Sequence, residues 1–83
     1  MYSNLIGKAR NLVVEITLRS TQLKLAGKIN EVDEVFVELL VWANTATGKF
    51  AMDRETYQRA DKGESGWQED RILVNIADIS VIA

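Results

Sequence analysis

The sequence contains no cysteine, no histidine and no proline. Without cysteine the chain cannot form disulfides or thiolate-metal sites. Because histidine is also absent, the Ser-His-Asp, Cys-His and His-zinc arrangements of many enzymes are excluded. The sequence has no glycine-rich phosphate-binding loop either. We therefore expect no enzymatic activity, no cofactor and no bound metal.

Long apolar runs and basic runs are absent as well. No segment approaches the ~20 apolar residues of a membrane span, and residues 1–7 lack the basic start and apolar stretch of a secretory signal. We therefore expect a cytoplasmic protein without membrane contact. The net charge is −2, which disfavours tight, non-specific binding to phosphates, because that affinity comes from Lys and Arg.

The chain is small, with 83 residues, and we expect a single domain over residues 1–83. A domain of this size buries only a modest share of its surface and often needs additional stabilisation. With disulfides and thiolate-metal sites excluded, self-association is the remaining common source of that stability.

Hydrophobic periodicity predicts a short helix followed by strands. The helix covers residues 3–11, and period-two alternation predicts strands over 12–19 and 23–30. Gly27 lies inside the second strand, where a glycine indicates a sharp bend or a close backbone approach. A third strand runs from Val35 to about Ala43. The aliphatic row of this strand is predicted to face the core; it consists of Val35, Val37, Leu39 and Val41. The other row contains two aromatic residues and is predicted to need a partner; it consists of Phe36, Glu38, Leu40 and Trp42.

Residues 44–68 are predicted to form a long variable loop, with a turn at 44–48, a short strand at 49–52 and a helical turn at 53–60. Two further strands follow, from Trp67 to about Asn75 and from Asp78 to Ile82, with a kink near Ala77. The last strand is almost entirely apolar and has neither proline nor lysine, so it lacks the usual protection of an exposed edge. We expect another copy to pair with it, in a closed ring.

The fold class expected from these patterns is mostly β, with a short N-terminal helix before a strongly bent five-stranded antiparallel sheet or small open barrel. Two segments indicate a family. Residues 23–33, LKLAGKINEVD, resemble the first Sm motif, in which a strand carries a glycine, then an apolar residue, then an aspartate. Residues 72–82, ILVNIADISVI, are similar to the second motif, and residues 77–82 resemble the end of the bacterial Hfq branch. On these motifs the chain is identified as a divergent member of the Sm-like, RNA-associated family.

This resemblance covers most of the chain outside residues 44–68. It implies a bent sheet whose fourth strand pairs with the fifth strand of a neighbouring subunit. Such pairing closes a ring of about five to seven subunits. The resemblance further implies that the ring binds short single-stranded RNA near its pore.

The resemblance also nominates RNA-binding positions. Family members have an aromatic residue or histidine shortly after the aspartate, and an asparagine two residues later. A direct count from Asp33 gives Val35 and Val37, whereas one extra residue in the turn gives Phe36 and Glu38. We prefer the second count because it preserves the strand alternation. In the second motif the family's arginine corresponds to Asn75, its glycine to Ile76, and Ala77 lies where an Asp or His is common. The candidates are therefore Asp33, Phe36, Glu38, Asn75 and Ala77.

Each candidate has a simpler structural interpretation. Phe36 either stacks on a base or packs in a ring interface, and Asn75 either binds a base edge or caps a bend. Asp33 is expected to orient the backbone of its turn. Trp42 and Trp67 are expected to be interface or core residues rather than RNA contacts.

The remaining charged residues are expected at the surface. The acidic cluster of Glu31, Asp33 and Glu34 is interpreted as a solvated turn, because three carboxylates are too few for a hard-cation site. If RNA is bound, residues of the long loop are candidate phosphate partners, namely Arg54, Arg59 and Lys62. Two functions stay open: an RNA-binding ring, or the same ring without an RNA pocket and with protein partners.

Overall fold

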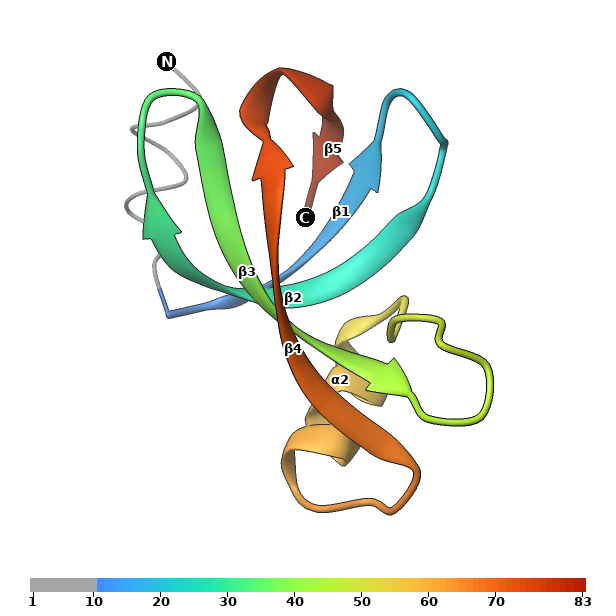
Figure 1. Cartoon of the computed structure of the whole chain (residues 1–83). Helices are drawn as coiled ribbons and strands as arrows, with labels where there is room; N and C mark the ends of the chain where they lie inside the picture. Colours follow the sequence, from blue (N-terminus) through green and yellow to red (C-terminus); the bar gives the residue numbers. More distant parts are fainter. Residues whose placement is uncertain (1–10) are drawn as a thin grey trace.

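The computed structural model describes residues 11–83, so the helix expected at 3–11 lies outside the described residues except for its last position, Asn11. The chain is mostly β, with one α-helix (Figure 1). Its elements, in chain order, are β1 (Val13–Leu18), β2 (Lys24–Val32), β3 (Phe36–Asn44), α2 (Arg54–Asp61), β4 (Trp67–Asn75), the short 3-10 helix η1 (Ile76–Asp78) and β5 (Ile79–Ile82). The five longer strands that were predicted are therefore present.

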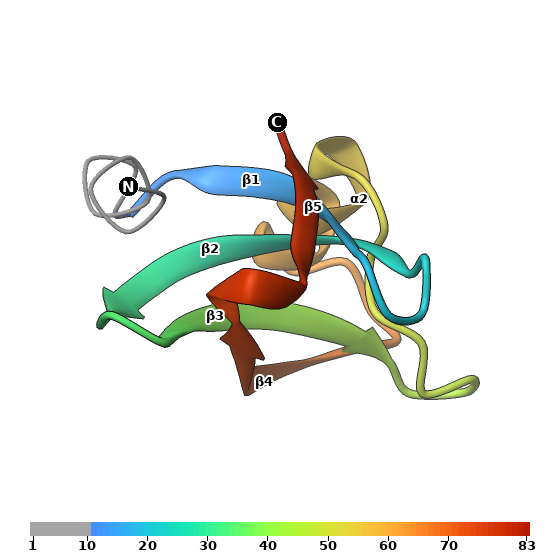
Figure 2. The same cartoon turned by 90° about the horizontal axis from the view of Figure 1, so that it is seen from above.

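The strands form one antiparallel sheet in the order β4-β3-β2-β1-β5. The sheet curves strongly, and β5 crosses over the curved layer formed by β1, β2 and β3 (Figure 2). β4 and β5 are the two edge strands, because β4 pairs with β3 alone and β5 with β1 alone. The predicted five-stranded antiparallel sheet is confirmed. It is not closed, however, so the small barrel is not confirmed.

The main core lies on the concave face of the sheet, where alternate residues of the strands meet. On β3 these are Val37, Leu39 and Val41, which are almost completely buried, as predicted. The assignment of Val35 to the same row is wrong, since half of its surface is exposed. Asp33 Oδ1 accepts hydrogen bonds from the backbone N–H groups of Val35 and Phe36, both at 2.7 Å, so Val35 belongs to the turn before β3.

At Gly27, β2 packs closely against β3. A Cβ atom there would lie 3.1 Å from Val41 Cγ1, 3.2 Å from Leu39 Cβ and 3.2 Å from the Leu40 carbonyl oxygen. A side chain would fit here only if these neighbours moved by a few tenths of an ångström. The prediction of a close backbone approach at Gly27 is confirmed.

The 44–68 segment is more regular than a loop. The strand expected at 49–52 reduces to a single bridge between Phe50 and Ala43. The predicted helical turn is the eight-residue helix α2, which Asp53 caps by accepting a hydrogen bond from Thr56 N at 2.7 Å. In the described part of the chain, no helix has the length and apolar character needed to cross a membrane.

Helix α2 covers part of the convex face and encloses a second apolar cluster there. Its members are Ala26, Ala51 and Tyr57, with Val13, Trp42 and Trp67 packed against them. Burial, with Asp61 and Glu69 nearby, raises the pKa of Tyr57 to about 12. Within residues 11–83, the buried Trp42 indole N–H has no hydrogen-bond partner. The two tryptophans therefore contribute to a small core.

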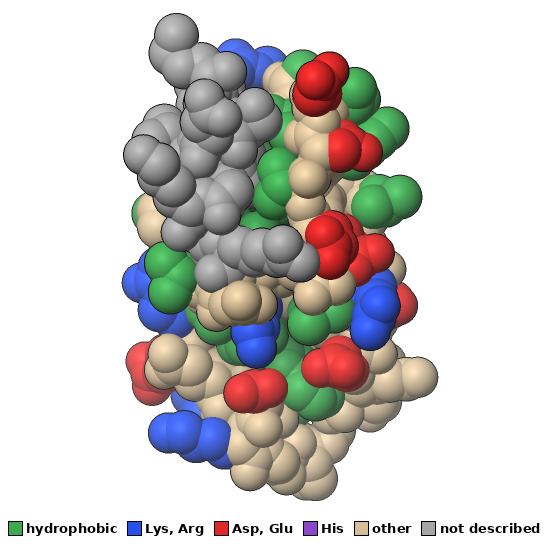
Figure 3. All heavy atoms as spheres, turned by 90° about the vertical axis from the view of Figure 1, so that its left-hand side faces the viewer, with side chains coloured by type: hydrophobic (Ala, Val, Ile, Leu, Met, Phe, Trp, Pro, Cys, Tyr) green, Lys and Arg blue, Asp and Glu red, His purple; other side chains and the backbone are tan. Residues whose placement is uncertain are grey.

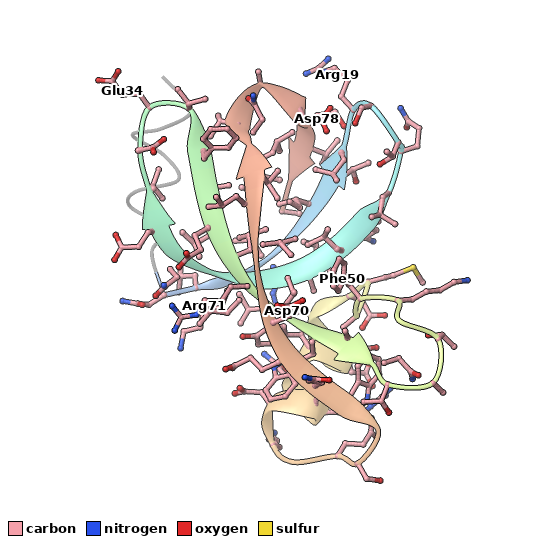
Figure 4. The ribbon with its side chains drawn as sticks, viewed as in Figure 1. Arg19, Glu34, Phe50, Asp70, Arg71 and Asp78 are labelled. Carbon is pink, nitrogen blue, oxygen red and sulfur yellow. The ribbon has the colours of Figure 1, made fainter. Side chains whose placement is uncertain are left out.

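The predicted kink between the last two strands is the 3-10 helix η1. Asn75 Oδ1 accepts a hydrogen bond from Ala77 N at 2.9 Å, which starts the turn. The carboxylate of Asp78 accepts hydrogen bonds from the N–H and hydroxyl of Ser20, both at 2.7 Å. Figure 4 shows Asp78 beside Arg19, where η1 meets the β1–β2 turn. Hydrogen bonds therefore connect η1 to the β1–β2 turn at the same end of the molecule.

Candidate functional site

A hollow of about 270 Å³ lies beside the β2–β3 turn. This volume is close to the lower end of the ~300–1,000 Å³ of small-molecule clefts. Three of the lining residues are acidic and three are apolar; they are Glu31, Asp33, Glu38 and Val32, Phe36, Leu73. Figure 3 shows acidic and hydrophobic side chains next to one another on this side of the molecule.

The strand registers explain why these residues meet. Phe36 and Glu38 lie on the same face of β3, because they are two residues apart. Phe36 is opposite Asn75 on β4, and Glu38 is opposite Leu73 on β4 and Glu31 on β2. The β2–β3 register shifts between Ile29 and Glu31, and this irregularity brings Glu31 opposite Glu38.

A row of basic residues lies beside this one on the same face. Leu40 of β3 is opposite Lys28 on β2 and Arg71 on β4. Arg71 extends from β4 across the outer surface of the sheet (Figure 4). The order of rows from the β2–β3 turn is therefore aromatic and amide, then acidic, then basic.

Glu38 is a carboxylate of the hollow that contacts side chains of both neighbouring strands, β2 and β4. Its Oε1 accepts a hydrogen bond from Asn30 Nδ2 at 2.6 Å and lies 4.0 Å from Arg71 Nη1. About a quarter of its side chain is exposed. Glu31 lies directly opposite Glu38, and two like charges in such a pair repel each other. The contacts of Glu38 with Asn30 and Arg71 offset part of this repulsion.

Asp33 has the structural role that was expected of it. Its hydrogen bonds from the N–H groups of Phe36 and Val35 lower the pKa of this carboxyl, because they stabilise the charged form. Asp33 therefore stays ionised and holds the turn that presents Phe36.

Phe36 and Asn75 are close to one another at the same end of the sheet. Phe36 has 40% of its surface exposed, although it lies in a strand. Asn75 caps η1 through Oδ1, whereas its Nδ2 makes no hydrogen bond within residues 11–83. Ala77 is exposed in η1 and does not line the hollow. Three of the five candidates therefore line the hollow, namely Asp33, Phe36 and Glu38. Asn75 does not line it but is paired with Phe36, and Ala77 does neither.

Two of the three basic residues proposed from the long loop make contacts elsewhere. Arg54 donates to the carbonyl oxygens of Val13 at 3.2 Å and Ala83 at 3.0 Å. Arg59 lies 3.6 Å from Glu55 and 3.5 Å from Glu64. In Figure 1, helix α2 and the β2–β3 turn lie towards opposite ends of the molecule, and the hollow is lined by residues next to that turn. That Arg54, Arg59 and Lys62 contact phosphates stays a prediction. Lys28 and Arg71, which are both opposite Leu40, are the cations closer to Phe36 in the strand register.

Sequence reasoning did not find Leu73, Val32 or Arg71 as neighbours of the site. Leu73 and Arg71 belong to a strand whose pairing with β3 cannot be read from local spacing. No group of three or more metal-ligating side chains occurs within residues 11–83, so the acidic turn has no such arrangement. Comparisons with protein-family models, with curated proteins and with solved structures find no match to this chain.

Proposed function

We propose that this protein is a subunit of an Sm-like homo-oligomeric ring that binds short single-stranded RNA beside Phe36. The observation that carries the proposal is the strand order, which leaves β4 and β5 as two unpaired edges of one bent sheet. The resemblance of residues 23–33 and 72–82 to the Sm motifs predicts that these two edges pair between neighbouring copies.

The outer edge of β4 has backbone groups available for such pairing. Ile76 N donates to the Val35 carbonyl at 2.8 Å, so this pair belongs to the hydrogen-bonded series between β3 and β4. Hydrogen-bonded and non-hydrogen-bonded pairs alternate in an antiparallel ladder. Arg71, Leu73 and Asn75 fall in the alternate series, so their N–H and C=O groups point away from β3.

The outer edge of β5 has the same property. Glu15 and Ala83 exchange two hydrogen bonds, at 3.0 and 2.8 Å. Ile82 is the next residue of β5 and is opposite Ile16, so its backbone groups point away from β1. The strand Ile79–Ile82 has no charged residue, and Val81 is 55% exposed. An uncharged, apolar edge favours pairing with another strand, and head-to-tail pairing in a ring leaves no edge free.

RNA binding is supported by the residues at the β2–β3 turn. An exposed aromatic ring beside a hollow offers a stacking surface, which is worth ~1–3 kcal/mol per base. Asn75, directly opposite Phe36, has an Nδ2 group able to donate to a base. Lys28 and Arg71 lie within two rows of Phe36 on the same face and are suitable contacts for phosphates.

The ring is tested by light scattering on the full chain and on Val81→Lys. The added charge on β5 should convert the oligomer into a smaller species, because buried lysine would block edge pairing. Met52→Lys is the matched control, since Met52 is 58% exposed and lies outside both edge strands. A wild-type chain that is monomeric in dilute solution would contradict the ring.

RNA binding is tested by fluorescence anisotropy with labelled oligo-U, oligo-A and mixed-sequence RNA at two salt concentrations. Phe36→Ala should weaken binding about fivefold or more, as expected for the loss of one stacked base, without changing the oligomer. Unchanged anisotropy with every RNA at high micromolar protein would rule out this function. Dissociation of the ring by Phe36→Ala would instead assign Phe36 to the interface.

A second candidate function is a ring that binds protein rather than RNA. The three carboxylates of the hollow favour it, because they repel phosphates and attract basic side chains. A ring that binds an arginine-rich peptide but none of these RNAs would favour this alternative.

A further inference from the structure

The polar side chains that line the hollow are all hydrogen-bond acceptors. Ionised carboxylates accept hydrogen bonds and cannot donate them, and the polar lining consists of Glu31, Asp33 and Glu38. A base bound here must therefore supply the donors. Building on the proposed RNA binding, we propose that the hollow selects guanine, stacked on Phe36 and bound by Glu38 through its Watson–Crick edge.

Guanine is favoured because of its donor pattern. Its N1–H and 2-amino group are adjacent and parallel, so a single carboxylate accepts both. Uracil presents one N–H between two carbonyl oxygens, which would face the carboxylate and be repelled. Adenine and cytosine each offer one amino group beside an acceptor nitrogen. Recognition of unstacked bases by stacking and Watson–Crick hydrogen bonds is the common mode for single-stranded RNA.

Glu38 is suited to this role, whereas Asp33 is already in use. Asp33 Oδ1 holds two backbone N–H groups of its own turn. Glu38 accepts one hydrogen bond, from Asn30 Nδ2, and a carboxylate has about four lone-pair sites. The contact with Asn30 fixes the side chain and leaves sites for two further donors.

The spacing between stacking surface and acceptor also fits a base. Phe36 and Glu38 lie two residues apart on the same face of β3, a separation of about 7 Å along an extended strand. A ring that stacks on Phe36 can therefore extend its edge towards Glu38. The next row, with Lys28 and Arg71, supplies positive charge on the far side of Glu38 and offsets the repulsion between phosphates and the acidic row.

The test compares three labelled RNAs of equal length on the wild-type protein, by anisotropy: alternating guanosine and uridine, the same with inosine replacing guanosine, and uridine alone. Inosine lacks the 2-amino group and retains N1–H. We expect guanosine RNA to bind about 5- to 150-fold more tightly than uridine RNA, the range expected for bidentate base recognition, with inosine RNA between them.

Glu38→Gln should remove this preference, because an amide offers one acceptor and places a donor opposite guanine's own donors. Glu34→Gln is the matched control, since Glu34 is an exposed acid of the same turn that does not line the hollow (Figure 4). Equal affinity for the three RNAs would overturn the guanine inference while leaving RNA binding intact. Absence of binding to all three would refute the proposed function itself, and Glu38-dependent binding of an arginine peptide alone would assign the hollow to a protein partner.

Discussion

Gly27→Ala tests the close contact between β2 and β3 that accompanies the bend of the sheet. The new methyl carbon would lie 3.1–3.2 Å from Val41 Cγ1, Leu39 Cβ and the Leu40 carbonyl oxygen, whereas favourable carbon–carbon contacts are about 3.5–4.0 Å. Overpacking of this kind costs ~1–3 kcal/mol. The lower entropy of the unfolded chain returns ~0.4–1 kcal/mol.

The net expected loss is about 1–2 kcal/mol of unfolding free energy. For a domain of this size, that lowers Tm by roughly 4–16 °C. The assays are thermal and urea unfolding followed by circular dichroism. Strand β2 lies between β4 and β5, the two edge strands that are proposed to pair in the ring. If the added methyl group flattens β2, the relative placement of these edges should change. The oligomer distribution in light scattering should then shift as well.

A double-mutant cycle identifies the cause of the loss. Val41→Ala removes Cγ1, the nearest atom, so Gly27→Ala should cost less in that background, with a coupling of at least about 0.5 kcal/mol. Gly48→Ala is the control, because its φ of 73° makes the substitution costly while nothing lies within 4 Å of the added carbon. Its effect should add to that of Val41→Ala. An unchanged or raised Tm for Gly27→Ala, or the absence of coupling, would refute the close packing of β2 on β3.

Two further predictions concern helix α2. Arg54→Ala should lower the unfolding free energy by on the order of 1 kcal/mol, because the side chain is a charged donor to the carbonyls of Val13 and Ala83. Hydrogen exchange should accelerate at the backbone amides of Glu15 and Ala83. Arg54→Lys should restore only part of the lost stability. Burial raises the pKa of Tyr57 to about 12 in the folded state, so its contribution to stability is complete below the unfolded value of about 10 and is lost as the pH rises towards 12. Tyr57→Phe should flatten this alkaline decrease in Tm, and an equally steep decrease in that variant would contradict it.

The strands were predictable because each has a local pattern. Val14 and Ile16 alternate with polar residues and are buried, and the bounds Trp67–Asn75 coincide with those of β4. Gly27 and the kink after Asn75 were also visible, since glycine and a polar cap interrupt the apolar period. Val35 was misplaced because alternation alone does not show that Asp33 binds the backbone of the next residues.

The surroundings of the candidate site were less predictable, because they depend on pairing between distant strands. The sequence placed Phe36 and Glu38 on one row, but the opposition of Glu31 to Glu38 requires the register shift after Ile29. The aromatic and apolar residues of this β3 row were expected to need a partner. For Trp42 that partner is internal, since Ala51 and Tyr57 of the same chain pack beside it.

Leu73 connects the two proposals physically. It is 67% exposed, it lines the hollow beside Glu38, and its backbone points to the outer edge of β4. In the proposed ring a neighbour's β5 would lie along this edge, and the hollow would gain an apolar wall from the second copy. A ligand that contacts such a wall binds the assembled form more tightly than the single subunit, and by linkage it must then favour assembly by the same free energy. Because Leu73 belongs both to the outer edge of β4 and to the hollow, a substitution there should change assembly and RNA binding together. A substitution at Val81 should act on assembly, and one at Glu38 on binding.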